Sequence, residues 1–280
     1  MATEHTLHQE DVQGSESVWM GGKEPFKASY GKLMMWYFLL SDAFTFACFL
    51  IAYGTLRFSS PTWPVPDFVF STLPGGFHHK PLIFVTIMTF VLIVSSVTMV
   101  RAVQEGHRYN KKGVVFWMLM TIVGGLTFLG CQAWEWTTLI GGEHMTIHVN
   151  PFGTHVENGT YLEGDGHDIK AGDAFHAGQT YLIHKYDGHW TPLSYQTESG
   201  AIKEQQFGPK AFGALFFFIT GFHGFHVLSG VVFLMIIMIN VASGIYAKRQ
   251  NHYEMVEKIG LYWHFVDLVW VFVFLVFYLL

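Results

Sequence analysis

Five long stretches of apolar residues alternate with polar connections along this chain. A helix that crosses a hydrocarbon core about 30 Å thick needs about 20 mainly apolar residues, and each stretch reaches that length. The stretches are residues 33–56, 81–100, 113–140, a run within 211–247, and 260–280. This pattern predicts an all-α membrane protein with five transmembrane helices.

A polar segment, residues 141–209, separates the third apolar stretch from the fourth. The run TYLIHKYDGHWTPLSY within it places two short β-prone stretches around Asp187-Gly188, which is typical of a tight hairpin. We therefore expect a β-rich insert outside the membrane, between transmembrane helices 3 and 4. The predicted division is a cytoplasmic tail (1–32), transmembrane helices 1–3 (33–140), a periplasmic insert (141–209) and transmembrane helices 4–5 (210–280).

The distribution of Lys and Arg predicts the orientation of the chain, because these residues accumulate in cytoplasmic loops. On the side of the tail they are Lys23, Lys27, Lys32, Arg101, Arg108, Lys111, Lys112, Lys248, Arg249 and Lys258. The longer connections on the other side carry Arg57, Lys80, Lys170, Lys185, Lys203 and Lys210. We expect the N-terminus inside and the C-terminus outside.

The composition agrees with a membrane protein. The chain is 51% hydrophobic and 13% charged, whereas a soluble domain carries about a quarter charged residues. The small net charge of −5 gives no indication of nucleic-acid binding. The first 30 residues are polar and lack the apolar centre of a cleavable signal peptide. Cys48 and Cys131 fall in apolar runs, which argues against a disulfide framework.

Seven histidines lie in the insert, and they raise the question of a zinc or copper site. They are His144, His148, His155, His167, His176, His184 and His189. No compact ligand spacing such as H-E-x-x-H appears among them. We expect no metal there.

Asp42 is predicted to lie near the middle of the membrane, about 14 Å along a helix from Leu33 at 1.5 Å per residue. Ionisable groups at this depth are costly and usually pair with another group inside the protein. Two interpretations fit equally: a proton-sensitive or ligand-gating carboxyl, and a protonated acid hydrogen-bonded to a neighbouring helix. The other ionisable residues predicted at membrane depth are Glu135, His223, His226, His264 and Asp267.

His223 and His226 are three residues apart and share one helix face, as do His264 and Asp267. Neighbours at this spacing cannot hold a haem iron from opposite sides, and a di-iron site needs more carboxylates than these helices contain. A single metal bound by His223, His226, His264 and Asp267 is geometrically possible. We favour hydrogen bonds that join helices where lipid offers no partner.

The motifs FFFITGFHGFHVLSG and LYWHFVDLVWVFVF strongly resemble subunit III of haem–copper terminal oxidases. The resemblance continues through YFLLSDAFTFACFL, FVLIVSSVTMVRAVQEGHRYNKKG and LGCQAWEWTTL, where Gln132 and Glu135 match a Q-x-x-E pattern of the family. Together these motifs cover all five stretches in order. The resemblance implies five helices equivalent to the last five of the seven-helix members.

The family also implies a role. Subunit III of these oxidases carries no haem or copper, which belong to subunits I and II. It packs on subunit I, holds phospholipids in a cleft between helix groups, and supports proton uptake and sustained turnover in aerobic respiration. The resemblance therefore implies no catalytic or metal-binding residue in this chain, a structural role for the buried polar residues, and a bacterial inner membrane location. Our candidates for the lipid cleft are Trp36, Arg101, Trp263 and Trp270.

Two departures from the family leave questions open. Asp42 stands where the mitochondrial-type members carry Glu, and some quinol-oxidising members are also Asp-like there. A proton-pumping cytochrome c oxidase is the favoured assignment, with a quinol oxidase or an accessory subunit of a nitric oxide reductase as alternatives. The insert 141–209 is far longer than the usual connection. Its predicted outer position suggests contact with cytochrome c or a neighbouring respiratory complex.

Overall fold

The computed structural model describes residues 29–72, 82–166, 169–246 and 253–280 of this chain. Most of the tail expected over residues 1–32 lies outside them, and so does Pro81 at the start of the second predicted stretch. The basic residues of the orientation argument that also fall outside are Lys23, Lys27, Lys80, Lys248 and Arg249, together with the insert histidine His167.

Five of the described helices are long and apolar enough to cross a membrane, which confirms the predicted fold class. They are α1 (Tyr30–Ser59), α3 (Ile83–His107), α4 (Lys111–Thr137), α5 (Lys210–Ala242) and α6 (Glu254–Phe274). Two π-helical turns extend α4 and α6, namely η2 (Thr138–Gly142) and η4 (Leu275–Leu279). A short helix, α2 (Pro66–Val69), was not predicted, although proline suits the first turn of a helix.

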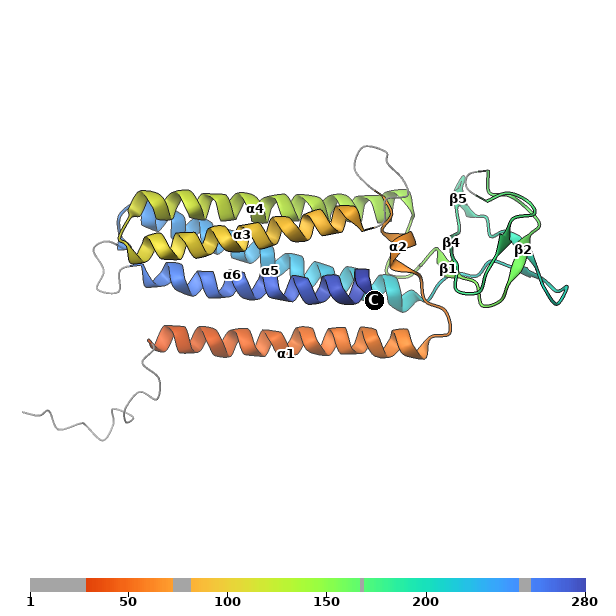
Figure 1. Cartoon of the computed structure of the whole chain (residues 1–280), viewed down its shortest axis with the longest axis horizontal. Coiled ribbons are helices and arrows are strands. Elements are labelled where there is room, and N and C mark those ends of the chain that lie inside the picture. Colours follow the sequence, from red (N-terminus) through yellow and green to blue (C-terminus); the bar gives the residue numbers. More distant parts are fainter. Residues whose placement is uncertain (1–28, 73–81, 167–168, 247–252) are drawn as a thin grey trace, which may run out of the picture.

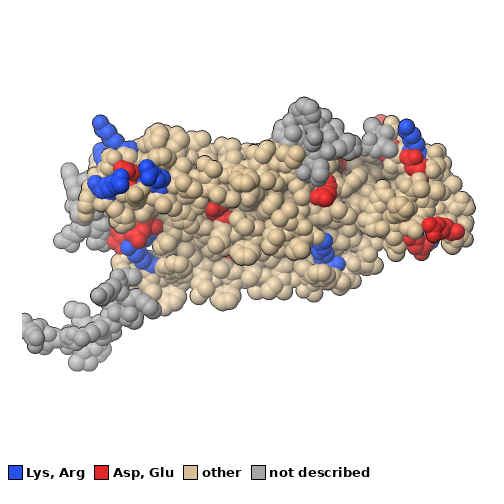
Figure 2. Space-filling model, in the orientation of Figure 1, with Lys and Arg blue, Asp and Glu red and all other residues tan. Residues whose placement is uncertain are grey.

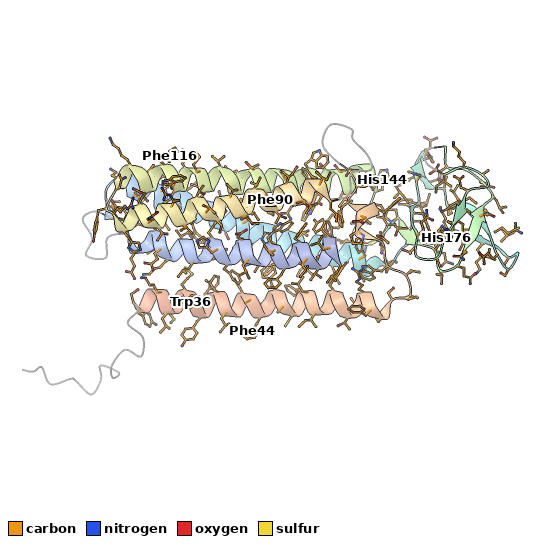
Figure 3. All side chains as sticks on the ribbon, in the orientation of Figure 1. Trp36, Phe44, Phe90, Phe116, His144 and His176 are labelled. Carbon is orange, nitrogen blue, oxygen red and sulfur yellow. The ribbon has the colours of Figure 1, made fainter. Side chains whose placement is uncertain are left out.

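Helices α3, α4, α5 and α6 form one bundle, and α1 lies along α6 at its edge (Figure 1). Aromatic rings make much of the contact to α1: the ring centroid of Phe46 lies 5.2 Å from that of Phe222, and Tyr53 lies 4.1 Å from Phe277. Phe44 and Phe90 instead extend from the outer surface (Figure 3). Exposed apolar side chains are expected on helices whose solvent is hydrocarbon.

Small residues allow the bundle helices to approach closely. A Cβ added at Gly125 of α4 would lie 2.5 Å from the ring of Trp263 in α6, so a larger residue would displace that indole. Gly124 meets Ser95 of α3 in the same way, with 2.7 Å between the added Cβ and the serine Cβ. Gly130, also in α4, faces open space and has no such contact. Close helix approach at small residues is the usual basis of packing in membranes.

Polar contacts fasten one end of α1 to α6 and the other end to Leu280, which follows η4. At the end near its first residue, Lys32 forms a 2.8 Å ion pair with Glu257, and the Ser29 hydroxyl donates to Glu254. At the other end, the Arg57 guanidinium donates to the main-chain carbonyl of Leu280. α1 is therefore held at its ends by charge and along its length by aromatic packing.

The segment between α4 and α5 is a small β-rich unit beyond one end of the bundle, as predicted (Figure 1). Its central antiparallel sheet has the order β3-β2-β7-β8, while β1 pairs with β4 and β5 with β6. The strands are β1 (Phe152–Thr154), β2 (Gly159–Tyr161), β3 (Ala174–Phe175), β4 (Thr180–Leu182), β5 (Lys185–Tyr186), β6 (His189–Trp190), β7 (Ser194–Thr197) and β8 (Ile202–Glu204).

The predicted Asp-Gly hairpin is confirmed as β5–β6, with Lys185 opposite Trp190 and Tyr186 opposite His189. Asp187 and Gly188 have φ values of 47° and 85°. A two-residue hairpin with both central residues in the left-handed region matches the right-handed twist of its strands. Glycine adopts that conformation without steric cost, which explains the sequence signal.

His155 lies at the centre of the insert, not on its surface. Its ring stacks on Phe175 at a centroid distance of 3.6 Å, and its Nε2 lies 2.7 Å from the Tyr161 hydroxyl. Its Nδ1 is buried and has no hydrogen-bond partner among the described residues. Desolvation of the ring lowers the pKa of His155 to about 4, so the neutral imidazole is the form that fits this core.

Hydrogen bonds tie the insert to the connection between α1 and α2. The backbone N–H of Val65 donates to the Thr180 hydroxyl at 2.8 Å, and the Thr154 hydroxyl donates to the carbonyl of Trp63 at 3.0 Å. The insert is therefore bound to the connection between α1 and α2, in addition to its covalent links to α4 and α5.

We expect acidification to destabilise the insert through His155. Between pH 6.5 and 4 the unfolded chain binds a proton at this residue and the folded insert does not, so the free energy of unfolding falls as the pH drops. The loss reaches about 3 kcal/mol. Hydrogen exchange of residues 152–206 in the full chain, corrected for the intrinsic rate at each pH, measures it.

His155→Phe should flatten this pH dependence, because phenylalanine keeps an aromatic ring and cannot bind a proton. His176→Phe is the matched control, since His176 is an exposed histidine of the same insert. Identical pH profiles for the wild type and His155→Phe would contradict the assignment.

Candidate functional site

Asp42 of α1 faces His226 of α5 within the membrane-spanning part of the protein. Asp42 Oδ2 lies 3.3 Å from His226 Nε2, and both side chains are largely buried. The other ring nitrogen, Nδ1, lies 2.8 Å from the carbonyl of Phe222 one turn earlier in α5. Both nitrogens of His226 are therefore occupied by contacts within the protein.

The geometry around His226 determines the position of one of its protons. The carbonyl of Phe222 can only accept a hydrogen bond, so Nδ1 must carry a hydrogen. The contact between Nε2 and the Asp42 carboxyl needs one further proton, which is carried either by the imidazole or by the acid. Asp42 and His226 consequently form a proton-sharing pair that joins α1 to α5, whichever partner holds the proton.

His223 lies one turn from His226 and is completely buried. Its Nε2 donates to the carbonyl of Val266 in α6 at 3.1 Å, and its ring packs between Phe128 and Trp270. Its Nδ1 is buried without a hydrogen-bond partner in the described part of the chain. His223 thus joins α5 to α6 as a hydrogen-bond donor.

Gln132 and Glu135, the two polar residues of LGCQAWEWTTL, lie on the buried face of α4. Gln132 Nε2 donates to the carbonyl of Thr220 in α5 at 2.7 Å, which Gly224 permits by leaving room beside the amide. The Tyr278 hydroxyl lies 3.1 Å from both carboxyl oxygens of Glu135. These contacts connect α4 to α5 and to the end of the chain.

The contacts between α3 and α6 are also polar at their centre. Ser96 Oγ lies 2.5 Å from His264 Nδ1, and Ser96 also interacts with Asp267. The indole N–H of Trp263 donates to the Ser95 hydroxyl at 3.1 Å, and that of Trp270 donates to Thr89 at 3.0 Å.

Two of the four lipid-cleft candidates require a correction. Trp263 and Trp270 are 1% and 0% exposed, and both rings lie in the protein core where no lipid reaches them. Trp36 lies on the exposed surface of α1 (Figure 3). Arg101 is exposed on α3, with its guanidinium 5.4 Å from the ring centroid of Trp117. The exposure of these tryptophans could not be predicted from residue type, because tryptophan occurs both in protein cores and at membrane interfaces.

The residues considered for a single metal do not form a cluster. His226 points to α1 and His223 to α6, while His264 lies against α3. Among the described residues no three His, Cys, Asp or Glu side chains lie close enough together to hold a metal ion. In the insert His155 is buried, His184 lies 3.5 Å from Asp165, and the exposed histidines are His144, His148, His176 and His189.

Two participants were not predicted. Tyr278, the partner of Glu135, lies in a long apolar run, and a buried phenol needs a hydrogen-bond partner there. Glu105 is buried at the turn between α3 and α4, where Asn110 Nδ2 donates to it at 2.7 Å. Asn110 also accepts from the backbone N–H of Gly113 and so caps α4. Asparagine just before a helical run is a signal that could have indicated this turn.

Comparison with known proteins points to one family. The family model described as cytochrome c oxidase subunit III matches residues 193–280. The cytochrome c oxidase subunit 3 of Alkalihalophilus pseudofirmus is 27% identical over 95% of this chain and 91% of its own length. The quinol oxidase subunit 3 of Bacillus subtilis is 26% identical over 89% of this chain and 86% of its own length. A shorter match, 46% identical over 24% of each chain, is found with the cytochrome c oxidase subunit 3 of Podospora anserina.

We expect Asp42 and His226 to be energetically coupled. Replacing one partner leaves the other without its hydrogen bond, so Asp42→Leu and His226→Leu should each destabilise the protein and combine with less than additive effect. The expected coupling is about 0.5–2 kcal/mol. Unfolding in bicelles of the two single variants and the double variant measures it.

Ser41→Ala is the control for this cycle, because the Ser41 hydroxyl donates to its own helix at the carbonyl of Phe38. It should show no coupling to His226→Leu. Strict additivity of the Asp42 and His226 substitutions would argue against the pair.

Proposed function

Because this chain belongs to the subunit III family of haem–copper oxidases, we propose that it is the third subunit of a proton-pumping cytochrome c oxidase in aerobic respiration. In this role it packs on subunit I beside subunit II, holds phospholipids, and supports proton uptake and sustained turnover. The haems and copper reside in the partner subunits, and this chain is itself non-catalytic.

The observation that supports a structural role is the use made of the membrane-buried polar groups. The two ring nitrogens of His226 contact the carbonyl of Phe222 and the carboxyl of Asp42. His223 donates to the carbonyl of Val266. Gln132 donates to Thr220, and Glu135 accepts from Tyr278. Each of these groups joins one helix to another, and hydrogen bonds between helices fix which faces meet in a bilayer.

The location that we propose is the bacterial inner membrane, with the N-terminus in the cytoplasm and the C-terminus in the periplasm. The support for this orientation is the positive charge at one end of the bundle. Arg108, Lys111 and Lys112 surround the turn between α3 and α4, and Figure 2 shows Lys and Arg gathered at that end. The insert 141–209 would then lie in the periplasm, where it is available to cytochrome c or a neighbouring respiratory complex.

For lipid binding we retain Trp36 and Arg101. The Trp36 ring is exposed on α1, as an interfacial tryptophan would be. Arg101 combines a cation with the Trp117 ring at the end of an apolar helix face, and its Nη1 donates to Gln104 at 3.0 Å. A cation at this depth suits the phosphate of a phospholipid headgroup.

A quinol oxidase is the second candidate. The relatives with long matches include quinol oxidase subunits 3 of two Bacillus species at 26% identity. Asp42, in place of glutamate, also agrees with that alternative. The two candidates share the same helix contacts and differ in the electron donor of the assembled enzyme.

Purification of the tagged chain from native membranes tests the proposal. We expect haem-containing oxidase subunits to accompany it, with a haem spectrum and oxygen consumption that reduced cytochrome c supports. Oxygen consumption with quinol but not with cytochrome c would favour the second candidate. Recovery of the chain without haem or partner subunits would contradict both.

Metal analysis gives an independent test. After dissociation from its partners, the isolated chain should contain neither iron nor copper, because its buried histidines are engaged in helix contacts. One equivalent of either metal per chain, retained through dialysis against a chelator, would overturn the structural assignment.

A further inference from the structure

A groove runs along the bundle between α3 and α4, on the side away from α1 (Figure 1). At its floor the two helices approach closely, since a Cβ added at Gly124 would lie 2.7 Å from the Cβ of Ser95. Its walls are apolar side chains, namely Phe90 and Val94 of α3 and Met120 and Val123 of α4. We call it the α3–α4 groove.

The dimensions of the α3–α4 groove fit one hydrocarbon chain. The groove has a volume of about 420 Å³ and extends along α3 from Ile87 to Thr98. At 1.5 Å per residue this length is about 16 Å, which gives a mean cross-section of about 25 Å². A helix with its side chains is about 10–12 Å wide and cannot enter so narrow a space. An extended acyl chain, one methylene wide, can lie along it.

The polar atoms that line the groove are already paired within the protein. The Ser95 hydroxyl donates to the carbonyl of Leu92 and accepts from the indole of Trp263. The Thr98 hydroxyl lies 2.7 Å from the carbonyl of Ser95 and 2.8 Å from the Thr121 hydroxyl. These groups therefore leave no demand for a polar ligand in the groove, which suits hydrocarbon.

A cation stands at one mouth of the groove. Arg101 follows Thr98 by one turn and continues the α3 stripe, since Val94, Thr98 and Arg101 recur at four- and three-residue intervals. Its guanidinium lies 5.4 Å from the ring centroid of Trp117 on α4, and its Nη1 donates to Gln104 at 3.0 Å. Both contacts are with neutral groups, so they leave the charge of Arg101 uncompensated.

The depth of Arg101 matches a lipid headgroup. It lies six residues before the end of α3, about 9 Å along the helix, and a long arginine side chain reaches the interface from there. Trp117 beside it is of the residue type that collects at this level of a bilayer. Arg108, Lys111 and Lys112 add positive charge at the same end of the bundle.

We propose that the α3–α4 groove binds one phospholipid, with an acyl chain along the groove and the phosphate on Arg101. The site is separate from the exposed Trp36, which lies on α1. Charge complementarity selects this occupant, because a phosphate at the mouth pairs with the guanidinium while the chain covers the apolar walls. The inference rests on the phospholipid binding in the proposed function and gives it a location.

Photolabelling tests the position of the acyl chain. The purified assembly is delipidated in detergent and reconstituted into phosphatidylcholine vesicles that contain a small fraction of phosphatidylglycerol with a diazirine on one acyl chain. Phe90 and Phe44 of α1 are a matched pair, with exposures of 61% and 65%. We expect adducts to be several times more frequent at Phe90. Equal or weaker labelling at Phe90 would overturn the proposal.

Substitution of the cation tests the headgroup contact. Arg101→Gln should lower the labelling of Phe90 about fivefold, the contribution of one basic residue near anionic lipid. Arg101→Lys should retain most of the labelling, and Lys112→Gln, at an exposed cation of the same end, should leave it unchanged. The same diazirine chain supplied as a methyl ester carries no phosphate, so its labelling should not respond to Arg101→Gln. Unchanged labelling by phosphatidylglycerol in Arg101→Gln would refute the phosphate contact.

A substitution that fills the groove gives an independent test. Val91 lines the groove and is half-buried, so Val91→Phe should abolish the preference for Phe90 with either probe. Val97→Phe places the same ring on an exposed position of α3 outside the groove and should preserve it. A preserved preference in Val91→Phe would contradict the groove as the site. If that variant does not accumulate, the Arg101 variants decide.

The outcomes separate this inference from the proposed function. If haem subunits accompany the chain and Phe90 shows no preference, only the lipid site is wrong. If Phe90 is labelled in the Arg101-dependent manner but no haem accompanies the chain, the oxidase assignment fails and the lipid site stands.

Discussion

Hydrocarbon offers no hydrogen-bond partner, and this constraint organises the whole molecule. A polar side chain at membrane depth can find its partner on a neighbouring helix, and each one that does so also determines which helix lies beside it. Asp42 and His226 join α1 to α5, His223 joins α5 to α6, and Ser96 with His264 joins α3 to α6. The bonds are individually weak, but together they select one arrangement of otherwise similar apolar rods.

The helical part of this fold could be read from the sequence because its signals are local. A run of about 20 apolar residues is long enough to cross a bilayer as a helix and forms little else. In the insert, Asp187-Gly188 specifies its own hairpin turn. Partners distant in the chain carry no such signal. The carbonyl of Val266 as acceptor for His223, and Tyr278 as donor to Glu135, depend on how helices rotate against each other. The burial of Trp263 and Trp270 could not be predicted for the same reason, because it depends on how α6 is rotated about its axis within the bundle.

His155 illustrates a different limit. Seven histidines in a polar insert suggested either a metal or exposed surface, yet one of them became the centre of an aromatic core. The insert is too small to bury many aliphatic side chains, and stacked rings provide large buried area from few residues. Sequence position does not distinguish the buried His155 from the exposed His176. The difference in burial arises only when the pairing of β2 with β3 brings Phe175 and Tyr161 together.

The bonds from Val65 and Trp63 to the insert have a mechanical consequence. Of the five long helices described, α1 packs least extensively against the others. Its C-terminal end, Ser59, leads directly into the segment that holds Trp63 and Val65. The position of the insert is therefore coupled to one end of α1 through these two hydrogen bonds, while the ion pair between Lys32 and Glu257 holds the opposite end.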